Sequence, residues 1–558
     1  MLVLPMLPIL IPLTTAIVCL FVRNSIPAMR AVSVTGAVAL VVAAAAVALR
    51  VHADGAPIAS QAAGWFAPYG ITIVADELSV ILVVMTAIVQ LGVLIYALGA
   101  LDARREKAFF HPLYHTLITA VCGAFLTGDI FNMYVWFEVM LLSSFVLITL
   151  GGERAQLEGG IKYVTLNLVS SALFLTAIGL LYGLAGTLNF ADLHVALQAV
   201  DFSDPANSDS KEMLTLIAML FLAAFGIKAA LWPFFFWLPA SYHTPPPVIA
   251  AIFAGLLTKV GVYSVVRVFT LVFGHDPGFV YTVLLVLATI SMLSGVLGAA
   301  VQYEVRRILA FHSVSQVGYM LMGFAIASLA WHGAGEAQLA GDATSAASLR
   351  TAATLALAGS IYFIFHHGIV KMNLFLIAGL IEKRKGSAQL KRIGGLFSDD
   401  WPLAAVFFVT SMALAGIPIL SGFWAKLALV RAGLMSGQYL VIGVSLFVSI
   451  LTLFSMTKIW AEAFWKPQPD DGDDVPIEFR PTAGRMALMF APTASFAAIA
   501  LFIGVGVGPL FDLCMSAARG VLEPMVYVEA VNPARLEAMQ AQGQLVEAAD
   551  DVIGGLTP

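Results

Sequence analysis

Charged residues are scarce in this chain of 558 residues. Asp, Glu, Lys and Arg together make up 11% of the sequence, whereas hydrophobic residues make up 60%, and the mean hydropathy is +0.92. A soluble domain usually carries about a quarter charged residues. The composition therefore excludes an ordinary soluble protein and predicts an all-α polytopic membrane protein embedded in the lipid bilayer.

Cysteine is also rare, and familiar enzymatic motifs are missing. The three cysteines, Cys19, Cys122 and Cys514, are far apart and form no CxxC or Cys/His cluster, which argues against disulfides and a metal site. The sequence has no phosphate-binding loop, dinucleotide glycine fingerprint or HExxH motif. We therefore expect no enzyme active site, no metal and no cofactor. The net charge of −5 comes without a broad basic patch, so nucleic acid is not expected as a partner.

What the chain has instead is a series of long apolar runs. A helix needs about 20 apolar residues to cross the hydrocarbon core, and about fourteen runs qualify. They lie near 2–22, 31–49, 73–99, 110–127, 130–150, 160–185, 213–238, 246–273, 278–300, 307–330, 351–381, 402–434, 437–465 and 486–510. The first run lacks a basic flank and a cleavage site, so we expect a retained helix rather than a cleaved signal. After the last run we expect only a short tail, acidic at 530–558.

Basic residues predict the orientation of these helices. Clusters such as Arg104, Arg105 and Lys107 follow the odd-numbered runs, whereas the opposite loops hold scattered charges such as Lys211 and Arg267. Loops rich in Lys and Arg stay in the cytoplasm. This pattern predicts a plasma-membrane protein with both termini outside the cytoplasm.

Five ionisable residues interrupt the apolar runs, each in a different one: Glu138, Lys228, Lys259, Lys371 and Lys426. A charge at mid-membrane costs from roughly 3 to over 10 kcal/mol. One such residue could reflect packing alone, or a lysine that snorkels to the interface. Five of them indicate a polar path through the membrane.

The acidic residues suggest partners for this path. A buried lysine balanced between desolvation and a nearby carboxylate can change its protonation state, as a proton relay requires. Glu138 is the only acidic residue deep within the first half, so it is the natural partner of Lys228. The alternative is a static ion pair that fixes helix packing. Asp129 lies nine residues before Glu138 and is either a proton-uptake group or a helix cap.

Histidines add a second polar cluster. His366, His367 and Lys371 occur together in an apolar run, and His367 and Lys371 are four residues apart, hence on one helical face. Imidazole titrates near neutral pH and can pass protons, although a buried histidine is often only a hydrogen-bonded core residue. His243 and His312 lie near predicted loops, where a relay role and a structural hydrogen bond are equally consistent with the sequence.

Two prolines predict broken helices. Pro233 follows Lys228 by five residues, and Pro418 precedes Lys426 by eight. Proline removes a backbone donor and clashes with the preceding turn, and the freed carbonyls need protein or water to satisfy them. Interrupted helices in corresponding halves are typical of inverted repeats around an ion site. An ordinary kink is the alternative for either one.

Four stretches of sequence resemble a known family. They are FNMYVWFEVMLLSSFVLITLGG at 131–152, the FGIKAALWPFFFWLP and HTPPPVIAAIFAGLLTKVGVY block at 225–263, RRILAFHSVSQVGYM at 306–320 and LAGIPILSGFWAKL at 414–427. In order and spacing they resemble the antiporter-like subunits shared by Mrp-type cation/proton antiporters and respiratory complex I, over about residues 70–465. Within that family the chain looks most like the D subunits of Mrp Na⁺/H⁺ antiporters. Lys426 is one reason, because the M-type subunit of complex I usually has Glu there.

The resemblance implies a fold of fourteen helices with two inverted five-helix repeats and two broken helices. The expected parts are helices 1–3 in 1–109, one repeat in 110–273, the other in 278–465, and the last helix with the tail in 486–558. It also implies that Glu138 and Lys228 form a coupling pair, and that a hydrated axis continues through Lys259, His367, Lys371 and Lys426.

The implied function is that of a proton-translocating subunit of a multisubunit Na⁺/H⁺ antiporter in a bacterial plasma membrane. Its partners would be other hydrophobic antiporter subunits, with protons, and Na⁺ as an open case, as the ions moved. A proton-pumping subunit of a complex I-type or membrane hydrogenase complex is the alternative. Neither function requires a cofactor in this chain.

Overall fold

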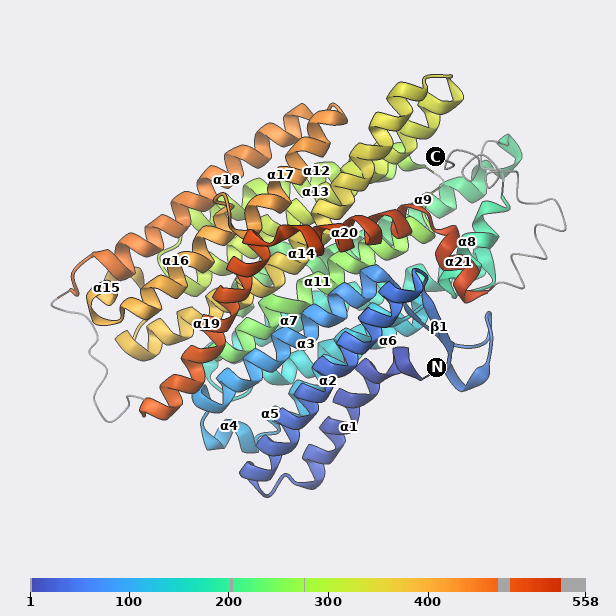
Figure 1. The fold of residues 1–558 in the computed structure, drawn as a ribbon. Helices are drawn as coiled ribbons and strands as arrows, with labels where there is room; N and C mark the ends of the chain where they lie inside the picture. The colour runs from blue at the N-terminus through green and yellow to red at the C-terminus, as the bar shows by residue number, and fades with distance from the viewer. Residues whose placement is uncertain (1–2, 201–203, 275, 470–481, 533–558) are drawn as a thin grey trace.

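The computed structural model describes residues 3–200, 204–274, 276–469 and 482–532. They form a bundle of long, roughly parallel helices (Figure 1). Twelve helices in the described residues are long and apolar enough to cross a membrane. The short apolar helix α5 and the broken pair α16–α17 supply two more crossings, so the fourteen predicted runs all correspond to helical crossings.

The main helices are α1 (Leu7–Phe21), α2 (Ile26–Asp54), α3 (Glu77–Ala100), α5 (Phe110–Leu126), α6 (Ile130–Ile148), α7 (Arg154–Ala185), α9 (Ser208–Ala229), α11 (Pro247–Leu271), α12 (Pro277–Ala300), α13 (Val305–Leu339), α14 (Ala343–Lys385), α16 (Trp401–Ala415), α17 (Ser421–Met435), α18 (Tyr439–Trp460) and α19 (Ala483–Val505). Short helices α4 (Ala103–Lys107), α8 (Phe190–Gln198), α10 (Trp237–Tyr242) and α15 (Leu396–Asp399) lie between them.

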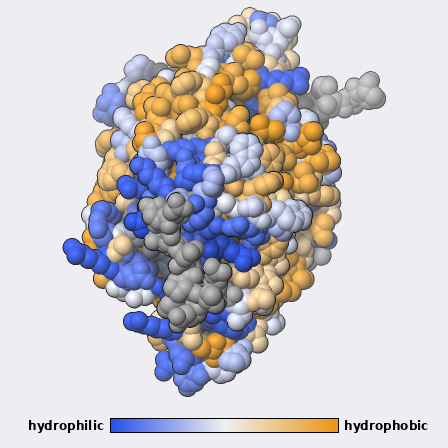
Figure 2. All heavy atoms as spheres, turned by 90° about the vertical axis from the view of Figure 1, so that its left-hand side faces the viewer, coloured by the Kyte–Doolittle hydropathy of each residue, from blue (hydrophilic) through white to orange (hydrophobic). Residues whose placement is uncertain are grey.

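Hydrophobic side chains cover the flanks of the bundle, as a lipid-facing surface requires. Seen from the end that carries α4 and α15, hydrophilic residues gather in the middle of the face and reach its left and lower edges, and hydrophobic residues cover much of the right-hand and upper parts (Figure 2). The most apolar segments of α11 and α14 are completely buried inside the bundle. These central helices carry Lys259 and Lys371, so the charges lie in the protein interior rather than against lipid.

Both predicted helix breaks are present. Helix α9 ends at Ala229, and Ala230 has a positive φ of 61° before the chain reaches α10. Helix α16 ends at Ala415, and the next residue, Gly416, has a φ of 87° that suits glycine, which has no Cβ to clash. Pro418 then lies in the short link that leads to α17. Each break leaves carbonyl groups at a helix end without a partner in the helix.

Two features of the fold were not predicted from the sequence: a β-hairpin and two helices after the last crossing. An antiparallel hairpin pairs β1 (Ile58–Gln61) with β2 (Thr72–Ala75), so the protein is not purely helical. After α19 the chain turns into α20 (Val507–Leu522), which packs across α14 and α3, and then into α21 (Met525–Val531) against α8 and β1. Apart from residues 530–532, the predicted acidic tail lies outside the described residues.

The hairpin, α21 and the start of α1 lie at one end of the bundle, opposite α4 and α15 (Figure 1). The loops rich in Lys and Arg lie at the α4 and α15 end, hereafter the basic end, and the other is the hairpin end. Which end faces the cytoplasm, and the boundaries of the two repeats, stay predictions.

Candidate functional site

Five central helices bring the predicted site residues together. Helix α9 packs on α11, α11 on α14, and α14 on both α13 and α17. Lys228, Lys259, Lys371 and Lys426 lie on α9, α11, α14 and α17 in that order, and all four are buried. The helices come close where glycine allows it: a Cβ at Gly261 would lie 2.6 Å from the backbone nitrogen of Ala229. The lysines therefore follow one another across the bundle.

Lys228 is the second-last residue of α9, beside the helix break at Ala230. Its Nζ donates hydrogen bonds to the carbonyl of Asn167 and the hydroxyl of Ser171 on α7, both at 3.4 Å, and lies 5.6 Å from the ring centre of Phe137. Glu138 is half-buried and acts on Lys228 electrostatically. Oε1 of Glu138 has no hydrogen-bond partner in the described part of the chain.

Whether Glu138 and Lys228 form an ion pair distinguishes the two interpretations of this pair. Among the ion pairs of the described residues, none joins Glu138 to Lys228. A static ion pair that fixes the packing of α6 and α9 is therefore not what holds these helices together here. Glu138 acts on Lys228 electrostatically without forming an ion pair with it. The coupling role predicted for the two residues stays a prediction.

Lys259 and Lys371 face the same region from α11 and α14. Lys259 Nζ donates to the carbonyl of Ala254 on its own helix. Nζ of Lys371 has no partner among the described residues, and the two lysines repel one another electrostatically. Neither side chain is accessible to solvent, so snorkelling to the membrane surface does not explain either position.

The histidines form a polar cluster between α13, α14 and α17. Nδ1 of His366 lies 2.7 Å from the hydroxyl of Ser421, at the start of α17. His367 stacks on Phe363 with ring centres 6.3 Å apart. Both ring nitrogens of His367 and of His312 lack partners in the described residues, as do the side chains of two neighbours on α13, Ser315 and Gln316. Buried polar groups are nearly always satisfied by protein or water, so this cluster favours a hydrated interior.

Lys426 explains how the second break is stabilised. Its Nζ donates to the carbonyls of Ala415 at 2.9 Å and Leu414 at 3.4 Å, the last residues of α16. It also lies 5.1 Å from the ring centre of Tyr319 on α13. The carbonyls at a helix C-terminus lack intrahelical donors and carry partial negative charge. The ammonium group of Lys426 gives these carbonyls hydrogen-bond donors and places a positive charge beside their partial negative charge.

Two of the predicted residues serve local structure. Asp129 caps α6 by accepting a hydrogen bond at 2.7 Å from the backbone N–H of Asn132, as the helix-cap interpretation predicts. Nδ1 of His243 lies 2.8 Å from the carbonyl of Pro239, four residues earlier. Neither residue is hydrogen-bonded to the lysines or to the histidine cluster.

Replacing Asp129 with asparagine is expected to preserve transport, because asparagine caps helices about as well. Burial raises the pKa of Asp129 from 3.8 to about 6, although the backbone N–H of Asn132 opposes the shift. Because the pKa of Asp129 is higher in the folded than in the unfolded protein, this residue stabilises the fold below its unfolded pKa. That stabilisation is lost as the pH rises through about 6. Asp129→Asn should therefore be more stable than wild type at neutral pH by about 1 to 3 kcal/mol, with little difference below about pH 4.

The measurement is thermal unfolding of the purified complex at both pH values, beside Na⁺/H⁺ exchange at neutral pH. A proton-uptake role for Asp129 would appear instead as loss of exchange in a complex of normal stability.

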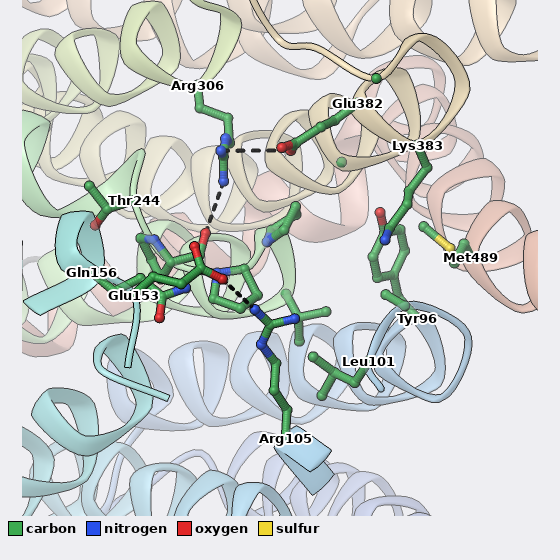
Figure 3. Close-up of a pocket in the computed structure, with 17 residues that line it drawn as sticks. Tyr96, Leu101, Arg105, Glu153, Gln156, Thr244, Arg306, Glu382, Lys383 and Met489 are labelled. Atoms are coloured by element: carbon green, nitrogen blue, oxygen red, sulfur yellow. Dashed lines mark hydrogen bonds and ion pairs between the residues drawn. The ribbon is translucent and has the colours of Figure 1, made fainter. Parts of the chain in front are cut away.

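Sequence reasoning missed a cavity of about 310 Å³ at the basic end. Figure 3 shows Arg105, Glu153, Arg306 and Glu382 around it. Arg105 pairs with Glu153 at 2.8 Å, and Arg306 with Glu382 at 3.6 Å. The cavity also reaches the first turn of α11 and Gly379 of α14, about 12 Å along α14 from Lys371 at 1.5 Å per residue. These charges follow the pattern of cytoplasmic loop residues, and nothing in the sequence places them around one cavity.

Sequence reasoning also misplaced Arg267. This residue is not a scattered loop charge but lies inside α11, where it is buried and paired with Asp76 at 2.6 Å. The spacing in the sequence could have indicated this position, because Lys259, Tyr263 and Arg267 follow one another at steps of four residues, as residues on one helical face do.

The fold and the buried row of lysines define a class of polytopic membrane proteins with charged helices at their core. The family model described as NADH:quinone oxidoreductase/Mrp antiporter, TM, matches residues 127–340 and 340–452. The chain is 39% identical to the D subunit of the Na⁺/H⁺ antiporter from Alkalihalophilus pseudofirmus over 525 residues, which are 94% of this chain and 98% of that one. The chain therefore belongs to the antiporter-like subunit family, in its Mrp D-subunit branch.

Solved structures agree with this assignment. A chain in the structure of the Mrp complex from Dietzia sp. DQ12-45-1b is 30% identical and superposes with a TM-score of 0.80, covering 95% of this chain and 99% of that one. A chain of respiratory complex I from Thermus thermophilus is 21% identical with a TM-score of 0.73, covering 94% and 100%. At that identity the second likeness shows a shared fold alone.

Proposed function

We propose that this chain moves protons within a multisubunit Na⁺/H⁺ antiporter, along a buried axis formed by Glu138, Lys228, Lys259, His367, Lys371 and Lys426. The observation that carries this proposal is the set of unpartnered polar atoms between Lys259 and Lys426. Nζ of Lys371 and both ring nitrogens of His367 and His312 are buried with no protein partner among the described residues. Groups that can gain and lose protons, placed in a row, can pass them on through bridging water.

The lysines would transfer charge by repulsion. Lys259 acts on Lys371 electrostatically, and like charges repel one another more in a medium of low dielectric constant than in water. A proton that arrives on Lys259 therefore favours release of the proton on Lys371. His367 and His312 each feel the charge of Lys371, and each can take a proton on one ring nitrogen and release one from the other. His312 also feels Lys426, which would make Lys426 the next acceptor.

The first half of the axis would be switched by Glu138. With Glu138 ionised and near, a proton on Lys228 is stabilised by attraction. Because the two groups do not form an ion pair, a small movement of α6 or α9 changes that attraction. Such a movement would release the proton from Lys228 toward Lys259 on the adjacent α11.

The cavity at the basic end would give protons access to the axis. The cavity reaches the first turn of α11 and the last turns of α14. These helices carry Lys259 and Lys371. Its carboxylates, Glu153 and Glu382, can accept protons from bulk water. We further propose that this end faces the cytoplasm, as the basic loops predict.

Protons rather than Na⁺ suit this axis. Apart from Glu138, the side chains of this axis are lysines and histidines, which bind protons but offer nitrogen rather than oxygen atoms to a cation. A Na⁺ path would instead need several oxygen ligands, as hard cations do. We therefore assign proton movement to this chain, and we expect hydrophobic partner subunits to complete the antiporter.

The test is Na⁺/H⁺ exchange by the purified complex in liposomes, with His367→Ala in this chain. We expect exchange to fall by about tenfold, a partial loss because His312 offers a second imidazole for proton transfer. His332→Ala, a half-buried histidine on α13 that stacks on Tyr281, is the matched control and should exchange at the wild-type rate.

The subunits that copurify decide between the two functions. Small hydrophobic subunits alone support the antiporter, whereas flavin- or iron–sulfur-containing subunits would support a redox complex.

Wild-type exchange in His367→Ala would remove the histidine cluster from the axis.

A further inference from the structure

A second polar line leaves Lys259 toward the hairpin end. Tyr263 and Arg267 follow Lys259 at intervals of four residues on α11, so all three lie on one helical face. Eight residues of helix span about 12 Å. This line runs opposite to the cavity, which opens at the first turn of α11. Without a barrier, it would lead a proton from Lys259 to the other side of the membrane.

Arg267 is fixed tightly at the end of this line. One guanidinium nitrogen donates to Oδ1 of Asp76 at 2.7 Å and forms an ion pair with Oδ2 at 2.6 Å, and Nε donates to the hydroxyl of Tyr263 at 3.1 Å. Tyr263 in turn donates to the carbonyl of Phe125 at 2.7 Å. Asp76 caps α3. The side chain of Arg267 is 4% exposed, so this paired cation is shielded from solvent.

Aromatic rings cover the guanidinium. Its central carbon lies 5.4 Å from the ring centre of Tyr263 and 5.1 Å from that of Tyr527. Tyr527 belongs to α21, the short helix that follows the lateral helix α20. It is buried, and its hydroxyl has no hydrogen-bond partner in the described residues. The ring, rather than the hydroxyl, is therefore what Tyr527 contributes.

Backbone hydrogen bonds close the surrounding layer. Gly128 donates to the carbonyl of Thr72 at 2.8 Å, and Phe190 donates to the carbonyl of Gly128 at 2.9 Å. These bonds join β2, the α5–α6 link and the start of α8 across the hairpin end. Helix α21 packs against α8 and β1 in the same layer.

We propose that Arg267, held by Asp76 and covered by Tyr263 and Tyr527, seals the hairpin end of the axis against proton leakage. This inference rests on the proposed proton axis. Arginine stays charged under all conditions met by proteins and cannot relay a proton. A fixed arginine is also an electrostatic barrier to protons and cations in membrane pores. A proton on Lys259 is thereby directed sideways to Lys371, which keeps its movement coupled to the rest of the axis.

The seal predicts a specific defect when the ring of Tyr527 is removed. In liposomes that contain the complex and a pH gradient but no Na⁺, Tyr527→Ala should raise the rate of proton leakage roughly fivefold or more, on the scale of a typical coupling between sites. Tyr527→Phe should not leak, because it keeps the ring and loses only an unpartnered hydroxyl. Tyr439→Ala, at an exposed position on α18, controls for loss of an aromatic residue elsewhere.

Tyr527→Leu covers the case in which the alanine variant does not assemble, since leucine fills much of the space but cannot interact with the cation. The proposed seal is supported if Tyr527→Ala or Tyr527→Leu leaks protons while Tyr527→Phe does not. Assembled Ala or Leu variants that are as tight as wild type overturn it, whether or not their exchange is reduced. The wild-type complex is measured in parallel: if it shows no Na⁺/H⁺ exchange, the proposed function fails independently of the leak result.

Discussion

Replacing Lys228 with alanine is expected to abolish Na⁺/H⁺ exchange in a complex that still assembles. The change removes the cation that Glu138 attracts and leaves a partly buried carboxylate without that compensation. It also removes the group that would receive the proton. We expect a loss of about 100-fold or more, the effect of deleting a positioned proton donor or acceptor. The measurement is exchange driven by a pH gradient in proteoliposomes, with assembly checked by copurification of the partner subunits.

Two further variants sharpen this result. Lys211→Ala removes a half-buried lysine from the same helix near its hairpin end and should leave exchange unchanged. Glu138→Gln keeps the shape of the side chain and removes its charge, so it should be as inactive as Lys228→Ala. If Lys228→Ala exchanges at the wild-type rate, Lys228 is a packing residue and the first half of the axis is wrong.

The helices and their breaks were predictable because local rules determine them. Apolar runs of about 20 residues mark crossings wherever they occur, and proline and glycine end helices by their own covalent structure. The burial of Lys228, Lys259, Lys371 and Lys426 was predictable for the same reason. Each lies at least eight residues inside its run, and Lys228 and Lys259 lie near the middle, from which a side chain cannot easily reach water.

Contacts between distant parts of the chain were not predictable in this way. The line of Lys259, Tyr263 and Arg267 is visible in the sequence, but its partners Asp76 and Tyr527 come from segments that are about 190 and 260 residues away. Helix α20 is too short for a crossing, so a rule based on span length passes over it. Likewise the separation of Glu138 from Lys228 depends on how α6 and α9 pack, which their sequences do not specify.

The two ends of the bundle differ, and this difference would give the proposed axis a direction. At the basic end a cavity lined by charged side chains reaches the helices of Lys259 and Lys371. At the hairpin end the line from Lys259 meets a paired arginine, two tyrosines and a hydrogen-bonded layer of backbone. A protein that lets protons reach Lys259 from one side only can couple their onward movement to another ion.

Replacing Lys426 with glutamate should block exchange as severely as the loss of Lys228. The Nζ of Lys426 binds the carbonyls of Leu414 and Ala415 at the end of α16. A carboxylate there would face those carbonyls with no donor and would sit at the negative end of the helix dipole. It would also reverse the charge felt by His312 and His366. We expect loss of about 100-fold or more in exchange, the effect of deleting a positioned proton-transfer group, because the ammonium that binds these carbonyls is lost and its charge is reversed.

Arg431→Glu makes the same charge reversal at an exposed position five residues later on α17 and should exchange normally. Lys426→Met separates the two causes, because it removes the charge and keeps most of the packing. If Lys426→Met is inactive in an assembled complex, the cation itself is required. If Lys426→Glu retains exchange, the site accepts either sign of charge as complex I-type subunits do, and the assignment of Lys426 as a proton acceptor specific to antiport is wrong.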